Sequence, residues 1–134
     1  MPVSYSYDQS SNLVRSEAWG ALTTGDFRDY TSSILDDPRI RPGFIEALVI
    51  HPDAVLQIQY ADVPPFRDVW KAYLRKGVRG TLIQAESNAG FGIFRMFEST
   101  IDSEDLNPDV RFELVRSPEE LEQRIDEIRR RYPV

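Results

Sequence analysis

Hydrophobic and polar residues alternate near both ends of the chain, at residues 3–7 and 110–114, a pattern typical of half-buried β-strands. A polar turn joins the first segment to a second strand at residues 13–19, which predicts an antiparallel hairpin at one edge of a sheet. The apolar run at residues 44–50 is nearly continuous and predicts a central strand covered on both faces. Residues 81–85 predict a further core strand.

Four other segments space their apolar residues as an amphipathic helix does. They are residues 23–37, residues 65–77, a segment that follows the stretch 87–90 and runs to residue 97, and residues 117–132. Thr23 is placed to cap the first helix, with Asp26 three residues later, and Pro38 stops it. Ser117 and Pro118 open the last helix as a cap and a first helical residue.

The order of these elements predicts the fold class. A hairpin is followed by helix, strand, helix, strand, helix, strand and helix, and strands separated by helices are expected to run parallel. We therefore predict an α/β fold, a mixed, mostly parallel sheet of about five strands with four helices. Residues 54–60 predict a short extra strand, and residues 102–109 a polar loop. The 134 residues are expected to form a single domain, residues 1–134.

Composition narrows the range of functions. The chain has 22 acidic and 16 basic residues, and its net charge of −6 disfavours general nucleic-acid binding. With no cysteine and one histidine, thiolate and multi-histidine metal sites and cysteine nucleophiles are excluded, so neither a metal site nor a cofactor is predicted. No targeting segment or transmembrane stretch is evident, which predicts a cytoplasmic protein.

Three segments carry a family resemblance: GALTTGDF at residues 20–27, DPRIRPGF at 37–44 and AGFGIFRMFES at 89–99. With the element order, they resemble the SpoIIAA-like, STAS-like family of small bacterial proteins over residues 3–131. That family is related by fold to anti-sigma-factor antagonists and more loosely to CRAL-TRIO lipid carriers, and most of its members have no assigned activity. The resemblance implies a SpoIIAA-like fold and regulation by protein contact.

The family's phosphorylation switch has no counterpart in this sequence. In phospho-switched antagonists, a serine or threonine lies at the start of the helix after the central strand, where free amides favour a phosphate. Residues 51–66, HPDAVLQIQYADVPPF, contain neither residue type. The resemblance therefore implies a regulatory protein-binding module that lacks the family phosphoacceptor serine.

Candidate ligand-binding residues are expected at the carboxyl edge of the sheet and at the start of the third helix, where open α/β sheets bind ligands. They are His51, Asp53, Ser87, Asn88, Gly90, Gly92 and Arg95. His51 oriented by Asp53 beside Ser87 is the arrangement with catalytic potential, but a lone histidine at a strand end more often bonds to backbone. No catalytic residue is therefore assigned. Gly90, Gly92 and Arg95 are the candidate anion site, and close packing of the helix on its sheet is the alternative interpretation.

A basic stripe on the second predicted helix is the candidate partner-binding surface. Arg67, Lys71 and Arg75 fall at intervals of four, and Lys76 and Arg79 extend the stripe. On an acidic protein this stripe suits an acidic partner or an anionic lipid surface, and a solvated helix face is the alternative.

Six aromatic residues on two helices flank the same strand. They are Phe66, Trp70, Tyr73, Phe91, Phe94 and Phe97. If they enclose a cavity, it suits an apolar small molecule, as in a lipid carrier; ordinary core packing is the alternative.

Taken together, these features predict a non-enzymatic protein that binds another protein through the basic helix and the neighbouring strand-end loops. The alternative is a binder of a small apolar or anionic ligand in a lipid-carrier-like pocket. Homodimer formation is compatible with either function, and neither the partner nor the ligand is identified by these residues.

Overall fold

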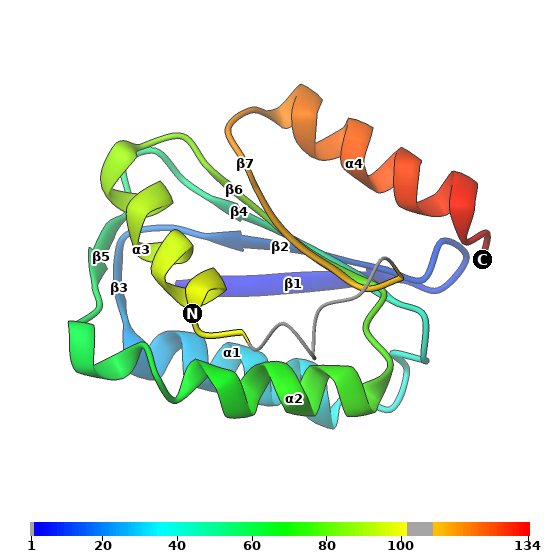
Figure 1. The fold of residues 1–134 in the computed structure, drawn as a ribbon, viewed down its shortest axis with the longest axis horizontal. Coiled ribbons are helices and arrows are strands. Elements are labelled where there is room, and N and C mark those ends of the chain that lie inside the picture. The colour runs from blue at the N-terminus through cyan, green and yellow to red at the C-terminus, as the bar shows by residue number, and fades with distance from the viewer. Residues whose placement is uncertain (1, 102–108) are drawn as a thin grey trace.

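The computed structural model describes residues 2–101 and 109–134, and most of the polar loop expected at 102–109 lies outside them. The main sheet contains β1 (Val3–Asp8), β2 (Leu13–Ala18), β4 (Ile45–Ile50), β6 (Gly80–Ala85) and β7 (Arg111–Val115). The helices are α1 (Thr24–Asp36), α2 (Phe66–Lys76), α3 (Asn88–Ser99) and α4 (Pro118–Arg131). The predicted α/β class is confirmed, with helices packed against a mixed sheet of five strands (Figure 1).

The strands lie in the order β1-β2-β4-β6-β7. β1 and β2 pair antiparallel, whereas the pairs β2–β4, β4–β6 and β6–β7 are parallel. The hairpin therefore occupies an edge of the sheet and β4 its centre, both as predicted. Each parallel pair requires a crossover, and α1, α2 and α3 provide them.

Two hydrophobic cores lie on opposite faces of this sheet. Helices α1, α2 and α3 pack against one face and α4 against the other (Figure 1). Along β4, Leu48 and Ile50 belong to the first core, and Ile45 and Ala47 to the second. A strand that is buried on both faces needs apolar residues at successive positions, which explains the continuous run in the sequence.

A second, two-stranded parallel sheet joins β3 (Ala21–Thr23) to β5 (Val55–Gln57). The predicted extra strand is present but shorter than residues 54–60, because a 3₁₀ turn, η1 (Tyr60–Asp62), follows it. β3 was not predicted. Three residues are too few to show an alternating pattern, and the capping sequence that follows β3 dominates the local signal.

The helix ends follow the local chemistry of the sequence. Thr23 and Asp26 form the expected capping box, with the Asp26 amide 3.2 Å from Thr23 Oγ1 and the Thr23 amide 2.9 Å from Asp26 Oδ2. Ser117 Oγ accepts a hydrogen bond from the Glu120 amide at 3.2 Å. Gly77 ends α2 at a φ of 97°, a left-handed conformation that favours glycine. A Cβ at this position would also lie 2.8 Å from Pro42, so a larger residue is excluded by contact as well.

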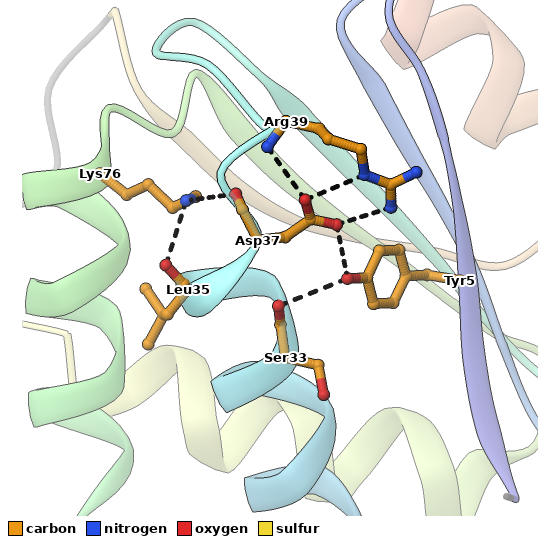
Figure 2. Close-up of polar contacts among 6 residues, drawn as sticks. All are labelled: Tyr5, Ser33, Leu35, Asp37, Arg39 and Lys76. Atoms are coloured by element: carbon orange, nitrogen blue, oxygen red, sulfur yellow. Dashed lines mark hydrogen bonds and ion pairs between the residues drawn. The ribbon is translucent and has the colours of Figure 1, made fainter.

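The carboxyl end of α1 is held by a polar cluster around Asp37 (Figure 2). The Asp37 carboxylate accepts hydrogen bonds from the Tyr5 hydroxyl at 2.9 Å and from the Arg39 guanidinium at 2.7 and 3.0 Å. Lys76 donates to the carbonyls of Leu35 and Asp37 at 3.1 and 3.0 Å. The cluster thereby joins β1, α1 and α2. The hydrogen bonds from Arg39 hold the pKa of the Asp37 carboxyl well below its usual range.

Asp37→Asn is expected to lower the free energy of unfolding at pH 7 by about 1 kcal/mol, a modest loss because Arg39 is partly solvated. The lowered pKa means that the carboxylate stabilises the fold above its ordinary pKa of about 3.9 and loses this effect as pH falls below that value. The difference between wild type and variant should therefore shrink in urea titrations below about pH 4. Asp36→Asn, at the exposed neighbouring position, is the control. Equal losses in both variants would contradict the role of the cluster.

Candidate ligand-binding site

A single acidic residue interrupts the apolar run of β4. Glu46 is only 3% exposed and lies on the sheet face covered by α1 and α2. Carboxylates are rarely buried to this degree without a partner, because removal from water costs several kcal/mol (order of magnitude). Its position at the centre of the sheet therefore calls for compensating contacts.

Those contacts come from hydroxyl groups on three elements. The hydroxyls of Tyr30 on α1 and Tyr73 on α2 donate to Glu46 Oε2 at 2.7 and 2.8 Å. Thr81 on β6 donates to Oε1 at 2.9 Å. Ser16 on β2 lies 2.5 Å from the Tyr30 oxygen. The Tyr30 hydrogen is directed at Glu46, so Ser16 is the donor in this last bond, and all five side chains form one buried network.

Burial sets the ionisation of this network. Desolvation raises the pKa of Glu46, and the three hydroxyl donors oppose that shift by favouring the carboxylate. Desolvation, with the neighbouring charge of Glu46, raises the pKa values of Tyr30 and Tyr73 well above the ordinary value. Both tyrosines therefore stay neutral and serve as hydrogen-bond donors to the Glu46 carboxylate.

The network borders a cavity of about 140 Å³ between the sheet and helices α1, α2 and α3. Most of its lining is aromatic or aliphatic: Phe27, Tyr30, Leu48, Ile58, Pro65, Phe66, Val69, Trp70, Tyr73, Ile83, Phe94, Phe97 and Phe112. Glu46 and Thr81 form the polar part of its buried end. Thr24, Arg28, Thr31 and Asp62 line the side nearer to solvent.

Asp62 forms hydrogen bonds that hold the outer side of the cavity together. Its carboxylate accepts hydrogen bonds from Thr24 Oγ1 at 2.8 Å and from the Gln59 amide at 3.1 Å. The bond from Thr24 ties η1, just before α2, to the start of α1, and the bond from Gln59 closes η1 itself. The outer rim of the cavity is thus a hydrogen-bonded junction between elements that are far apart in sequence.

Five of the six aromatic residues singled out in the sequence line the cavity. Phe66 and Phe97 pack edge to face with ring centroids 4.9 Å apart, whereas the pairs Trp70–Tyr73 and Phe94–Phe97 are tilted. Phe91 is the exception. It lies outside the cavity beneath the guanidinium of Arg116, 3.9 Å from the ring centroid.

The predicted residues at the start of α3 have structural partners. Ser87 caps α3 by accepting from the Gly90 amide at 3.0 Å, which occupies one of the amides expected to bind an anion. Asn88 accepts a hydrogen bond from Arg116 at 2.9 Å, and Arg95 pairs with Glu98 at 2.8 Å. Gly90 is buried and Gly92 is exposed. None of these five residues lines the cavity.

His51 and Asp53 lie on the exposed loop after β4. The His51 amide donates to the Ala18 carbonyl at 2.9 Å, the backbone bonding expected of a loop histidine. Within the described part of the chain, no hydrogen bond joins the side chains of His51, Asp53 and Ser87. The structure does not assemble the combination that had catalytic potential.

The basic stripe is only partly available for contact. Arg67 and Arg75 are exposed and Lys71 is half-buried. Lys76 is engaged with the carbonyls at the end of α1, and Arg79 bonds to the Asp109 carbonyl at 3.1 Å while stacking on Tyr132. Lys76 and Arg79, which were expected to extend the stripe, therefore form contacts that stabilise the fold.

Sequence reasoning missed the polar part of the site, namely Glu46, Tyr30, Thr81 and Ser16. One signal was available: a glutamate within FIEALVI, a run already assigned to a doubly covered strand. A charged residue at such a position requires buried partners and marks a site. The residues that donate to Glu46 were not identifiable, because they come from three other elements brought together only by the crossovers.

Comparison of the chain with protein-family models, with curated proteins and with solved structures finds no match. In residues 2–101 and 109–134, none of the helices has the length and apolar character needed to cross a bilayer.

Proposed function

We propose that this protein binds a small, largely apolar molecule in the cavity between the sheet and helices α1 to α3. The observation that carries the proposal is the combination of an aromatic-lined cavity with a buried carboxylate network at its inner end. Ligand sites typically combine mostly apolar walls with a few convergent polar groups and an ionisable residue of shifted pKa. The role is one of binding, without a catalytic step.

The cavity volume bounds the ligand size. Protein interiors are packed like organic crystals, and voids much larger than a water molecule are few. A cavity of about 150 Å³ accommodates benzene, and the cavity here measures about 140 Å³. A ligand of roughly six to ten non-hydrogen atoms fits this volume, with room for extension toward the outer rim.

The protein-contact hypothesis and the family relationship remain proposals. Support for a SpoIIAA-like, STAS-like architecture comes from the three resembling segments and from an element order that ends a mostly parallel sheet with an antiparallel hairpin. Support for partner binding is confined to Arg67, Lys71 and Arg75 on α2. The cavity supports ligand binding more strongly, because it combines volume, apolar lining and a polar group in one place.

Ligand binding is tested by titrating the protein with toluene and following heat change and melting temperature. We expect saturable binding of one toluene per chain and a rise in melting temperature with ligand concentration. Val69 lines the cavity, so the larger side chain of Val69→Phe should occupy part of the cavity volume and abolish binding. Val55→Phe makes the same change at an exposed position, 58% accessible, and should leave binding intact. Absence of saturable binding to the wild type, or equal binding by folded Val69→Phe, would refute the proposal.

A further inference from the structure

We propose that the ligand is a small apolar amine whose protonated nitrogen binds at Glu46. This inference rests on the proposed function, since it names the chemical class of the molecule that occupies the same cavity. It follows from the hydrogen bonds of the network, from the charges around it and from the composition of the walls.

The hydrogen atoms of the network are already committed. Tyr30, Tyr73 and Thr81 each direct their hydroxyl hydrogen to Glu46, and Ser16 directs its own to Tyr30. A carboxylate has about four lone-pair positions, and three are used here. The inner end of the cavity therefore offers hydrogen-bond acceptors. These acceptors are the remaining lone-pair position on Glu46 and the hydroxyl oxygens. The ligand group that matches them is a hydrogen-bond donor. An ammonium group supplies three N–H donors.

The charge of the network points the same way. In the described part of the chain, no basic side chain forms an ion pair with Glu46. A buried carboxylate is stabilised most by an opposite charge held at short distance in the same low-dielectric site. A ligand cation supplies that charge, whereas a ligand carboxylate or phosphate would face repulsion. The inference keeps the apolar ligand of the earlier alternative and replaces the anionic ligand by a cation.

The walls and the rim are compatible with a cation on an apolar body. Aromatic faces attract ammonium groups, and Trp70, Tyr73 and Phe66 are among the rings that line the cavity. Arg28 and Asp62 line the outer side with opposite charges, so the rim presents no net barrier to a cation. The molecule as a whole carries a net charge of −6, which favours the approach of cations over anions.

The test compares four probes of similar size by calorimetry at pH 7: benzylamine, benzyl alcohol, toluene and benzoate. We expect benzylamine to bind about tenfold more tightly than toluene, and benzoate to bind most weakly. In Glu46→Gln, the amine should lose its advantage, and its affinity should fall to within about twofold of the affinity of the same variant for toluene. Ammonium chloride at equal concentration controls for general attraction to the acidic surface.

The outcomes separate this inference from the proposed function. If toluene shows no saturable binding to the wild type, the proposed function is refuted and this inference, which rests on it, falls with it. If toluene binds and benzylamine binds no better, or benzyl alcohol equals benzylamine, the cationic ligand is refuted and the proposed function stands. An amine preference that persists in folded Glu46→Gln refutes the role of the carboxylate. Should that variant fail to fold, the wild-type probe series decides by itself.

Discussion

Trp70→Ala is expected to lower the free energy of unfolding by about 3–5 kcal/mol. Trp70 is 2% exposed and packs edge to face on Phe112, with ring centroids 5.5 Å apart and an interplanar angle of 88°. Its indole connects α2 to the sheet and also forms part of the cavity wall. The loss has two parts, the hydrophobic transfer energy of the ring and the enlargement of a void that the surroundings cannot fill.

The measurement is urea denaturation followed by circular dichroism, with Trp19→Ala as the matched control. Trp19 is 40% exposed, so the same truncation should cost no more than about 1 kcal/mol there. Indole added to Trp70→Ala should restore part of the stability, because it fills the space vacated within an existing cavity. Similar losses at the two positions would contradict the assignment of Trp70 to both core and cavity.

Tyr73→Phe is expected to lower the free energy of unfolding by about 1–3 kcal/mol with the ring packing retained. The change removes one hydroxyl, which donates to Glu46 Oε2 at 2.8 Å. Glu46 Oε2 then has Tyr30 as its sole remaining donor within the network, so fewer hydrogen bonds compensate for the desolvation of the carboxylate. The effect exceeds that of an average hydrogen bond because the acceptor is a buried ionisable group.

Tyr132→Phe is the control for this prediction. Within the described residues, the buried Tyr132 hydroxyl has no hydrogen-bond partner, so its removal should be neutral or slightly stabilising. Chemical denaturation of both variants at pH 7 gives the comparison. If Tyr73→Phe is as stable as Tyr132→Phe, the hydrogen bond from Tyr73 to Glu46 adds nothing to the free energy of unfolding, and water replaces the lost hydroxyl without cost.

The network links the candidate site to the stability of the fold. Glu46 receives bonds from α1, α2 and β6, and Tyr30 extends the connection to β2. The elements that form the inner end of the cavity are thus held by the same groups that offer acceptors to a ligand. A polar network of this kind rigidifies a pocket when every member is satisfied.

Much of the apolar part of the site was predictable. The helical spacing of Phe66, Trp70, Tyr73, Phe94 and Phe97 identified side chains that the structure places around one cavity. Helical spacing shows which residues share a face, and that face must meet the sheet. It does not show whether the facing side chains fill the space between them, because that depends on the separation and angle of the elements.

The residues chosen for polar chemistry illustrate the opposite case. His51, Ser87 and Arg95 were selected because strand ends and helix starts are common ligand sites. In the structure, Ser87 and Arg95 are engaged in a helix cap and an ion pair, and His51 is exposed with its amide bonded to the neighbouring strand. General rules of placement do not reveal local partners, and these partners were decided by packing.

By itself, the sequence determined the α/β class, the edge hairpin, the central β4, the capped helices α1 and α4, and the aromatic faces that line the cavity. These features depend on local propensity and on the periodicity of apolar residues. Only the tertiary structure decided that Tyr30, Tyr73 and Thr81 converge on Glu46 and that space remains beside them. Such convergence arises from crossovers that bring distant segments together, and no local pattern in the chain records it.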